Sequence, residues 1–140
     1  MAELRAAEWE TAPYWRERIH GYMTGTRHPR QALPPRTVVV AVEADRLVGF
    51  AAGHLTRRYG CDGELEWINV ARDRRGTGLA AQLLSWMAGW FGLQQAVRVC
   101  VDVDPDNAPA RAFYLRHGAR PLNAHWLVWE DIALAREERL

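Results

Sequence analysis

Residues 75–80, Arg-Gly-Thr-Gly-Leu-Ala, combine one arginine with two glycines at the start of an apolar segment. Residues 64–70, before this turn, follow the period of two that is typical of a strand. After the turn, apolar side chains recur at helical spacing, at Leu79, Leu83, Trp86, Met87 and Trp90. A glycine-rich turn between a strand and a helix points several main-chain N–H groups in one direction, and the helix dipole adds partial positive charge. The turn is therefore predicted to bind an anion such as a phosphate.

Two well-known phosphate loops do not fit this turn. A P-loop needs Gly-Lys-Ser/Thr, and the chain contains no lysine. The dinucleotide fingerprint needs a third glycine where this chain has Ala81. The pattern that does fit is Arg-x-x-Gly-x-Gly/Ala, read as Arg75, Gly78 and Ala80.

Carboxylates and a phenol supply the candidate acid–base groups. Glu64 and Glu66 share the parity of Ile68 and Val70 in a regular strand, opposite Leu65, Trp67 and Asn69. Both carboxylates are thus expected on one face, where a carboxylate can accept a proton. Residues 107–119, Asn-Ala-Pro-Ala-Arg-Ala-Phe-Tyr-Leu-Arg-His-Gly-Ala, predict a short helix at 108–116 that carries Tyr114 and is capped by Asp106 or Asn107.

The remaining pattern supplies the elements that must position these residues. In order, we expect a strand at 2–8, a helix at 11–23, a loop at 24–36, strands at 37–42, 47–55 and 64–70, a helix at 78–91 ended by Gly92, a strand at 96–101, the helix at 108–116, an irregular segment at 120–123 and a strand at 125–132. Turns at 43–46 and 59–63 make the middle strands a meander, and the helix at 78–91 is a right-handed crossover. This order predicts an α/β domain with a mixed sheet.

Composition limits the class of protein. A chain of 140 residues can bury a core without staples, so we expect one domain over 1–140, with a core at about 3–134 and a charged tail at 135–140. The formal net charge is +1 and no basic tract is present, so neither nucleic acid nor a membrane is an expected partner. Without a long apolar run or a signal peptide, we expect a soluble, cytoplasmic protein. Cys61 and Cys100 have no metal-ligand spacing, so we expect reduced thiols and no metal.

The turn at 75–80, the segment at 107–119 and the order of elements together resemble the GNAT N-acetyltransferase superfamily over residues of about 3–134. The second segment is similar to the family's Asn-xx-Ala-xx-Phe-Tyr-xxx-Gly-Phe/Ala pattern. The resemblance implies a mixed central sheet, an antiparallel meander plus a splayed parallel strand pair, flanked by helices. It also implies an acetyl-CoA-dependent N-acetyltransferase that releases coenzyme A.

The resemblance assigns expected roles to residues of this chain. Main-chain N–H groups of Gly76, Thr77, Gly78, Leu79 and Ala80 would bind the cofactor's diphosphate, with Arg75 adding a charged contact. Arg72 and Arg74 are either contacts to the 3′-phosphate or solvated surface charges. Ile68, Asn69 and Val70 would bind the pantetheine arm along a splayed strand edge, and Asn107 would bind it from the other side while also capping the helix.

The same resemblance gives the chemistry. Tyr114 would protonate the leaving thiolate, unless it is only a core aromatic residue. Glu66 is preferred to Glu64 as the general base, with a water relay also open. The acceptor would be a primary amine of a small molecule or peptide, attacking directly in a ternary complex beside Tyr14, Trp15, Tyr22, His125 and Trp126, with Glu64, Glu66 and Asp102 suited to a cation. A homodimer is also implied. The alternative is a non-catalytic acyl-CoA-binding or protein-interaction module with the same fold.

Overall fold

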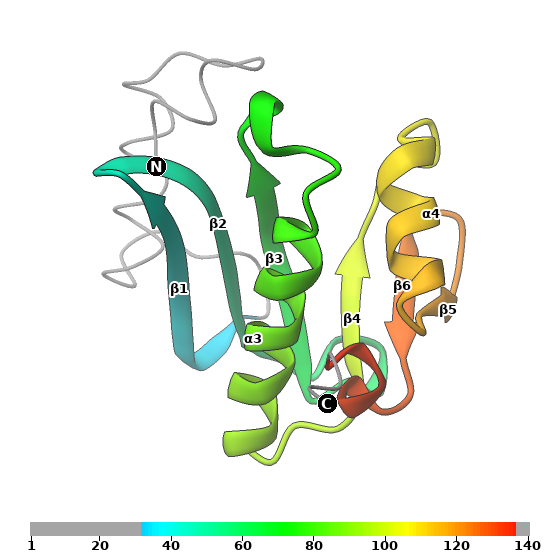
Figure 1. Cartoon of the computed structure of the whole chain (residues 1–140). Coiled ribbons are helices and arrows are strands. Elements are labelled where there is room, and N and C mark those ends of the chain that lie inside the picture. The colour runs from blue at the N-terminus through cyan, green and yellow to red at the C-terminus, as the bar shows by residue number, and fades with distance from the viewer. Residues whose placement is uncertain (1–31, 137–140) are drawn as a thin grey trace.

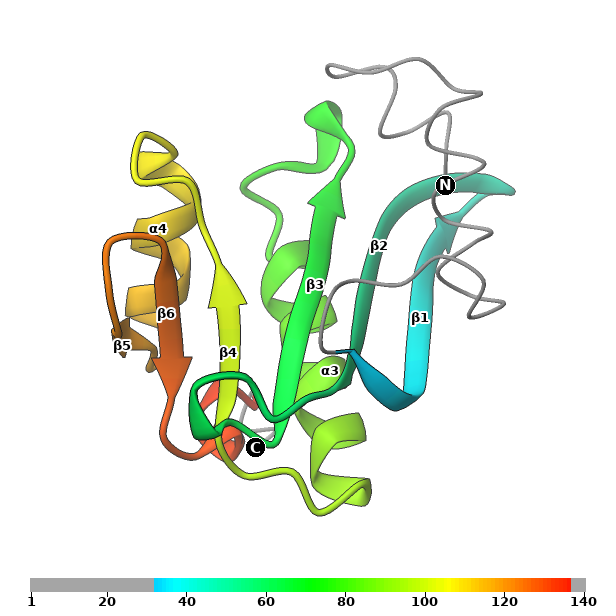
Figure 2. The same cartoon turned by 180° about the vertical axis from the view of Figure 1, so that it is seen from behind.

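The computed structural model describes residues 32–136, which form a six-stranded mixed sheet with two α-helices on one face (Figures 1 and 2). The elements are β1 (Leu33–Glu43), β2 (Arg46–Leu55), η1 (Arg58–Gly60), β3 (Gly63–Val70), η2 (Arg72–Arg74), α3 (Leu79–Leu93), β4 (Val99–Asp102), α4 (Ala108–Arg116), β5 (Arg120–Pro121), β6 (Trp126–Trp129) and η3 (Ile132–Ala135). The strand order is β1-β2-β3-β4-β6-β5. The α/β class and the mixed sheet are thus confirmed. The expected strand at 2–8, the helix at 11–23 and residues 137–140 of the tail lie outside the described residues.

The meander forms as expected, but its first strand is longer. Ala44 and Asp45 make the two-residue turn between β1 and β2 with φ of 50° and 64°, the left-handed conformation that such hairpin turns require. β1 begins at Leu33, within the segment expected to be a loop, and its register with β2 shifts between Leu33 and Arg36. Within the described sheet β1 is an edge strand, where Pro34 and Pro35 need not donate to a ladder.

Helix α3 covers the centre of the sheet with a different stripe from the one expected. Its buried residues are Leu83, Leu84, Met87, Ala88 and Phe91, whereas Trp86 is 47% exposed. Gly92 does not end the helix, which runs to Leu93. The close packing needs glycine in the sheet, because a Cβ on Gly63 would lie 2.6 Å from the ring of Phe91. The apolar spacing thus predicted the helix correctly, but its buried stripe is rotated by about one residue from the predicted one.

A β-bulge in β3 decides which side chains share a face. Leu65 pairs with Gly53 and Trp67 with Ala52, so Glu66 is an extra residue in β3. The alternation expected over 64–70 is therefore wrong beyond Glu66. Ile68 and Val70 pack with Leu65 in the core under α3, not on the side of the two glutamates. The opposite side carries Glu64, Glu66, Trp67 and Asn69 of β3 with Phe50, Ala52 and His54 of β2. It is called the open face below because neither α3 nor α4 covers it, although most of these side chains are buried.

β3 and β4 are parallel neighbours only at one end. Their ladder consists of Gly63–Val99, Glu64–Cys100 and Leu65–Val101. Beyond Leu65 and Val101 no described residue of β3 pairs with β4, and the strands diverge (Figure 1). This opening, called the gap below, is the splayed parallel pair that the fold class predicted.

The C-terminal elements differ from expectation mainly at their ends. β4 begins at Val99, not at Ala96, and continues to Asp102. The segment at 120–123 includes a two-residue strand, β5, which pairs with β6. β6 covers only Trp126–Trp129 of the range expected for the last strand. Cys61 and Cys100 lie together with Val128 in a small buried cluster on the open face, both as free thiols. None of the described helices has the length and apolarity needed to cross a membrane.

Candidate active site

The turn at 75–80 places main-chain donors at the start of α3. Gly76 and Gly78 have φ of 79° and 88°, a left-handed conformation that glycine adopts without strain. Gly78 is the N-cap residue; no described side chain caps the helix, and no acidic residue lies in its first turn. A Cβ built on either glycine meets no atom within 4 Å. The start of the helix is therefore uncapped and residues 75–78 before it are exposed, an arrangement that fits a diphosphate.

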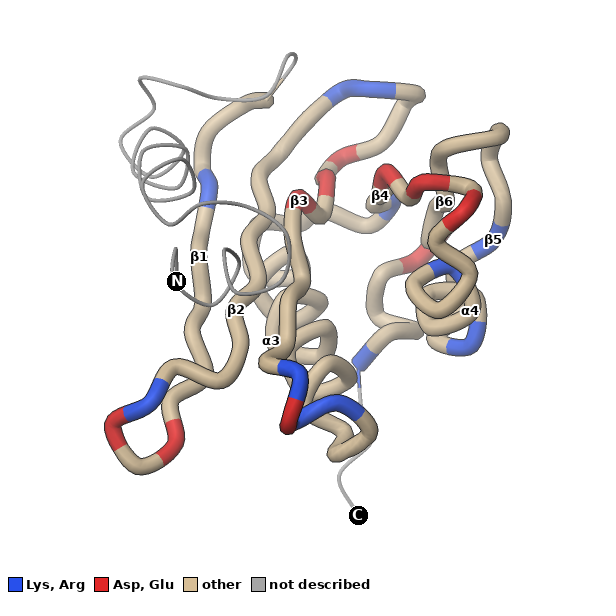
Figure 3. Tube along the Cα trace, turned by 90° about the horizontal axis from the view of Figure 1, so that it is seen from above, with Lys and Arg blue, Asp and Glu red and all other residues tan. Residues whose placement is uncertain are grey.

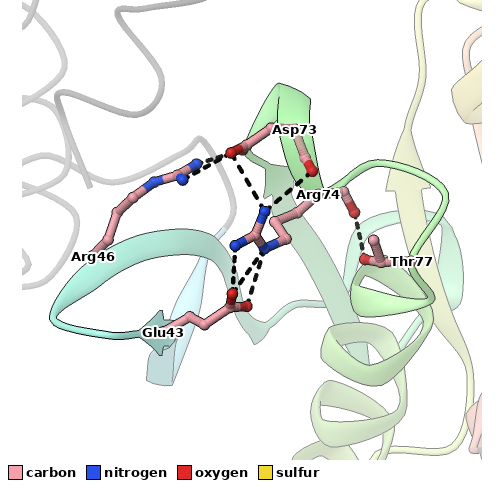
Figure 4. Close-up of polar contacts among 5 residues, drawn as sticks. All are labelled: Glu43, Arg46, Asp73, Arg74 and Thr77. Carbon is pink, nitrogen blue, oxygen red and sulfur yellow. Dashed lines mark hydrogen bonds and ion pairs between the residues drawn. The ribbon is translucent and has the colours of Figure 1, made fainter.

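Ion pairs hold the segment before this turn against the β1–β2 turn (Figure 4). Arg46 Nη1 donates to Asp73 Oδ2 at 2.8 Å, and Arg74 Nε donates to both carboxylate oxygens of Glu43 at 3.0 and 3.1 Å. The Thr77 hydroxyl donates to the carbonyl of Arg74. These bonds to Arg74 and Arg46 lower the pKa values of Glu43 and Asp73 respectively. Figure 3 shows the two groups of charges at the same end of the sheet.

These ion pairs bear on which arginines of this segment could contact a phosphate. Arg74 is bound to Glu43 and Asp73, so its charge already has partners within the protein. Arg75 and Arg72 are exposed to solvent. The predicted phosphate contact of Arg75 is thus compatible with its position, and Arg74 is less suited than Arg72 to reach a 3′-phosphate.

The residues expected to hold the pantetheine arm line the gap. Ile68, Asn69 and Val70 pair with β2 along one edge of β3, and their other edge faces the gap. An arm placed there could extend the sheet as an added strand would. Across the gap, Asn107 caps α4, and its Oδ1 accepts a hydrogen bond from the N–H of Ala110 at 3.3 Å.

The side chain of Tyr114, a residue of α4, packs in the core between that helix and the sheet. It is 8% exposed and meets the rings of Trp129 and Phe113 edge-on, with centroid distances of 5.6 and 5.4 Å. It belongs to the same core cluster as Val101 and Val103, next to the gap. The position suits a positioned acid and equally a packing role, so its chemical role stays a prediction.

On the open face, Glu64 is engaged by two cationic or titratable partners. It is 4% exposed, and its Oε1 lies 3.2 Å from Arg58 Nε and 3.6 Å from His54 Nε2. Arg58 also stacks over Trp126, 4.8 Å from the ring centroid. Glu64 Oε1 already accepts a hydrogen bond from Arg58, so a role of Glu64 as general base would have to displace that contact. Ligand atoms of His54, Glu64 and Glu66 lie within 4.8 Å of one another, and one of the two carboxylates, Glu64, is paired with Arg58.

For two residues of this face, His54 and Asp102, the structure shows surroundings that the sequence did not predict. His54, to which the sequence analysis assigns no role, is completely buried beside Glu64. Asp102 ends β4, and burial raises its pKa, with a further rise from Glu64 and a lowering by His125. Alternation along the strand could place His54 on one face, but its contact with Glu64 follows only from the register of β2 with β3.

Comparison with known proteins identifies the family. The model of the acetyltransferase (GNAT) family matches residues 1–119. A solved GNAT-family structure from Desulfovibrio desulfuricans has a TM-score of 0.71 and 22% identity, covering 94% of this chain and 92% of its own. Aminoglycoside 6′-acetyltransferase type Ii has a TM-score of 0.68 and 18% identity, covering 94% and 86%. PaiA N-acetyltransferase from Thermoplasma acidophilum, solved with coenzyme A, has a TM-score of 0.62 and 12% identity, covering 84% and 69%. A search of curated protein sequences gave no match. These three likenesses show a shared fold, and the family match shows that the chain belongs to the GNAT acetyltransferase family.

Proposed function

We propose that this protein transfers an acetyl group from acetyl-CoA to a primary amine of a small molecule or peptide. The observation that carries the proposal is the uncapped and exposed start of α3, which follows two left-handed glycines and has no acidic residue in its first turn. The gap between β3 and β4 continues from this site and offers an unpaired strand edge for an extended amide-bearing arm.

The proposed chemistry uses residues from both sides of the gap. Acetyl-CoA supplies the acetyl group as a thioester and carries the departing sulfur. Tyr114 gives its proton to that sulfur, and a main-chain N–H near Val70 donates to the acetyl oxygen. Glu66 receives the proton of the acceptor amine, with Glu64 or a water relay as the alternatives. Both cysteines of the chain are buried, Cys61 at 3% and Cys100 at 0% exposure, which favours direct attack by the amine over an acylated thiol.

A thiol-release assay with acetyl-CoA and a panel of amines, amino acids and peptide N-termini tests this function. We expect release of coenzyme A that depends on an amine, with mass spectrometry detecting an acceptor heavier by one acetyl group. Binding of acetyl-CoA without turnover of any amine would instead support the non-catalytic module. Absence of binding in a thermal-shift titration would contradict both.

Two further properties belong to the proposal. The resemblance implies pairing of two copies through the last strands, and β5 is an edge of the described sheet. Size-exclusion chromatography with light scattering tests the expected dimer. The proposed location is the cytoplasm, where acetyl-CoA is available, and cell fractionation tests it.

A further inference from the structure

The two cysteines of the chain meet in the fold although they are far apart in the sequence. Cys61 lies two residues before β3, and Cys100 is the second residue of β4. Both side chains pack with Val128 in one buried cluster, at 3% and 0% exposure. Both are free thiols, and a hydrogen bond joins them. Two thiols in direct contact can be joined by a disulfide with little movement of the backbone.

Main-chain hydrogen bonds hold the turn that carries Cys61 against the start of β4. The N–H of Asp62 donates to the carbonyl of Arg98 at 2.7 Å. In return, Asp62 Oδ2 accepts hydrogen bonds from the N–H groups of Val97 and Arg98 at 2.9 and 3.0 Å. Because these bonds involve the residue after Cys61 and the segment just before Cys100, the approach of the two thiols is a fixed feature of the fold.

The two thiols have different surroundings. Arg98 Nη1 lies 3.8 Å from Cys61 Sγ, whereas Cys100 Sγ donates to the carbonyl of Gly63 at 3.7 Å. The hydrogen bond between the thiols lowers the pKa of Cys61 and raises that of Cys100. Burial raises both pKa values, and the charge of Arg98 lowers that of Cys61. Since the thiolate is the reactive form, Cys61 is the nucleophile of the pair.

Other charges near Cys61 oppose the effect of Arg98. Asp62 and Glu130 both raise the pKa of Cys61. Arg98 Nε donates to the two carboxylate oxygens of Glu130 at 3.3 Å, and its Nη1 also donates to the carbonyl of Tyr59. These bonds hold the guanidinium beside the sulfur.

A cavity gives small molecules a path to Cys61. It has a volume of about 570 Å³ and is lined by Cys61 with its neighbours Gly60 and Asp62, by residues of β1 and β2, and by the segment after α3. Cys100 does not line this cavity and is completely buried. An oxidant that enters the cavity therefore reaches Cys61 first.

The pair is better suited to forming a disulfide than to holding a metal ion. A structural zinc site needs four ligands. Among residues 32–136, the only group of potential metal ligands is that of His54, Glu64 and Glu66, which includes neither thiol.

We propose that Cys61 and Cys100 form a redox site, which a small hydroperoxide converts into a reversible intramolecular disulfide. The thiolate of Cys61 attacks one peroxide oxygen, and the O–O bond breaks. This step leaves a sulfenic acid on Cys61 and releases water or an alcohol. The sulfur of Cys100 then bonds to the sulfur of Cys61, and the sulfenic oxygen leaves as water with the proton of Cys100. The two thiols lose two electrons to the peroxide, and an external dithiol can return them. This chemistry is independent of acetyl transfer.

Treatment of the folded protein with hydrogen peroxide tests the disulfide. We expect both free thiols to be lost together, the intact mass to fall by about two units, and dithiothreitol to restore both thiols. Peptide mapping should find Cys61 linked to Cys100 within one chain. If both thiols survive a treatment that oxidises the same chain in denaturant, or if bonds form only between chains, the proposal is wrong.

Serine variants test the order of the two steps. In Cys100→Ser, the sulfenic acid on Cys61 should persist long enough to be trapped by dimedone. In Cys61→Ser, the remaining thiol should react at least about tenfold more slowly than Cys61 does in Cys100→Ser. Alkylation of the wild-type protein by iodoacetamide gives a second measurement that needs no variant, and Cys61 should be modified first. Equal reactivity of the two cysteines in either measurement would overturn the assigned order.

A matched pair of arginine variants tests the activation of Cys61. Arg98 and Arg120 both pair with Glu130, but only Arg98 lies beside the sulfur. We expect Arg98→Gln to slow the reaction with peroxide roughly tenfold, and Arg120→Gln to keep the wild-type rate. A wild-type rate in Arg98→Gln, or an equal loss in both variants, would contradict activation by Arg98.

Discussion

The predicted cofactor site at the start of α3 and the polar cluster on the open face are built in different ways. On the helix side, the donors at the start of α3 are main-chain groups of consecutive residues, and two left-handed glycines expose them. On the open face, the polar groups are side chains of η1, β2, β3 and β4 that only the sheet brings together. The first site depends on local conformation, whereas the second depends on strand register. Mutations should therefore affect cofactor binding on one side and acceptor chemistry on the other.

The largest effect is expected from the group that joins the two sides. Tyr114→Phe keeps the ring contacts with Trp129 and Phe113 and removes only the hydroxyl. We expect turnover to fall by roughly 10- to 1000-fold, with acetyl-CoA affinity unchanged, because the departing sulfur loses its proton donor. Steady-state kinetics and calorimetry measure the two quantities. The exposed Tyr59, changed to Phe, is the matched control. Full activity in Tyr114→Phe would leave only a packing role.

Adding a methyl group at Gly78 is expected to weaken acetyl-CoA binding without changing the acceptor side of the site. Gly78→Ala places a side chain at a left-handed residue and beside the N–H groups, so acetyl-CoA affinity should fall by roughly 10- to 100-fold. Gly92→Ala lies within α3, and its added methyl likewise has no atom within 4 Å, so this variant should bind normally and gain about 0.5–1 kcal/mol of stability. Similar affinities for the two variants would show that the turn does not hold the diphosphate.

Substitution of the two glutamates of β3 should have different effects, mainly on stability for Glu64 and mainly on the reaction rate for Glu66. Glu64→Gln removes the charge that Arg58 and His54 contact, so we expect a loss of about 1–3 kcal/mol in the free energy of unfolding. Glu66→Gln should change stability less but lower the rate about tenfold, most at low pH, where more acceptor amine is protonated. Chemical denaturation and pH–rate profiles measure these effects. Unchanged pH–rate profiles in both variants would discard a role for either carboxylate as base.

The smallest effect is expected from the ion pairs that anchor the turn. Glu43→Gln removes the partner of Arg74 at an exposed site, so acetyl-CoA affinity should fall less than about fivefold. The hydrogen bond from Arg74 lowers the pKa of Glu43. The contribution of this ion pair to acetyl-CoA affinity is therefore present above the ordinary titration range of glutamate, and it is lost as the pH falls through the lowered pKa. Binding measured between neutral and acidic pH tests this. A larger loss would mean that Arg74, once released, changes the turn itself.

Predictability from sequence follows the same division. The two described α-helices and the turn before α3 were predicted from glycine placement and period, which are local signals, whereas the splayed strand pair was expected only from the resemblance to the family. The bulge at Glu66 was not, since its extra residue becomes visible only through pairing with Ala52 and Gly53. That single residue moved Ile68 and Val70 to the core side. His54 beside Glu64 was missed for the same reason: two residues ten positions apart meet through register.

The most direct test is a titration of isotopically labelled protein with coenzyme A, followed by the amide ¹H–¹⁵N resonances. If main-chain donors at the start of α3 hold the diphosphate, the largest shifts should be those of Gly76, Thr77, Gly78, Leu79 and Ala80, saturating with one affinity. Shifts confined to the open face, or no shift at the start of α3, would contradict the account.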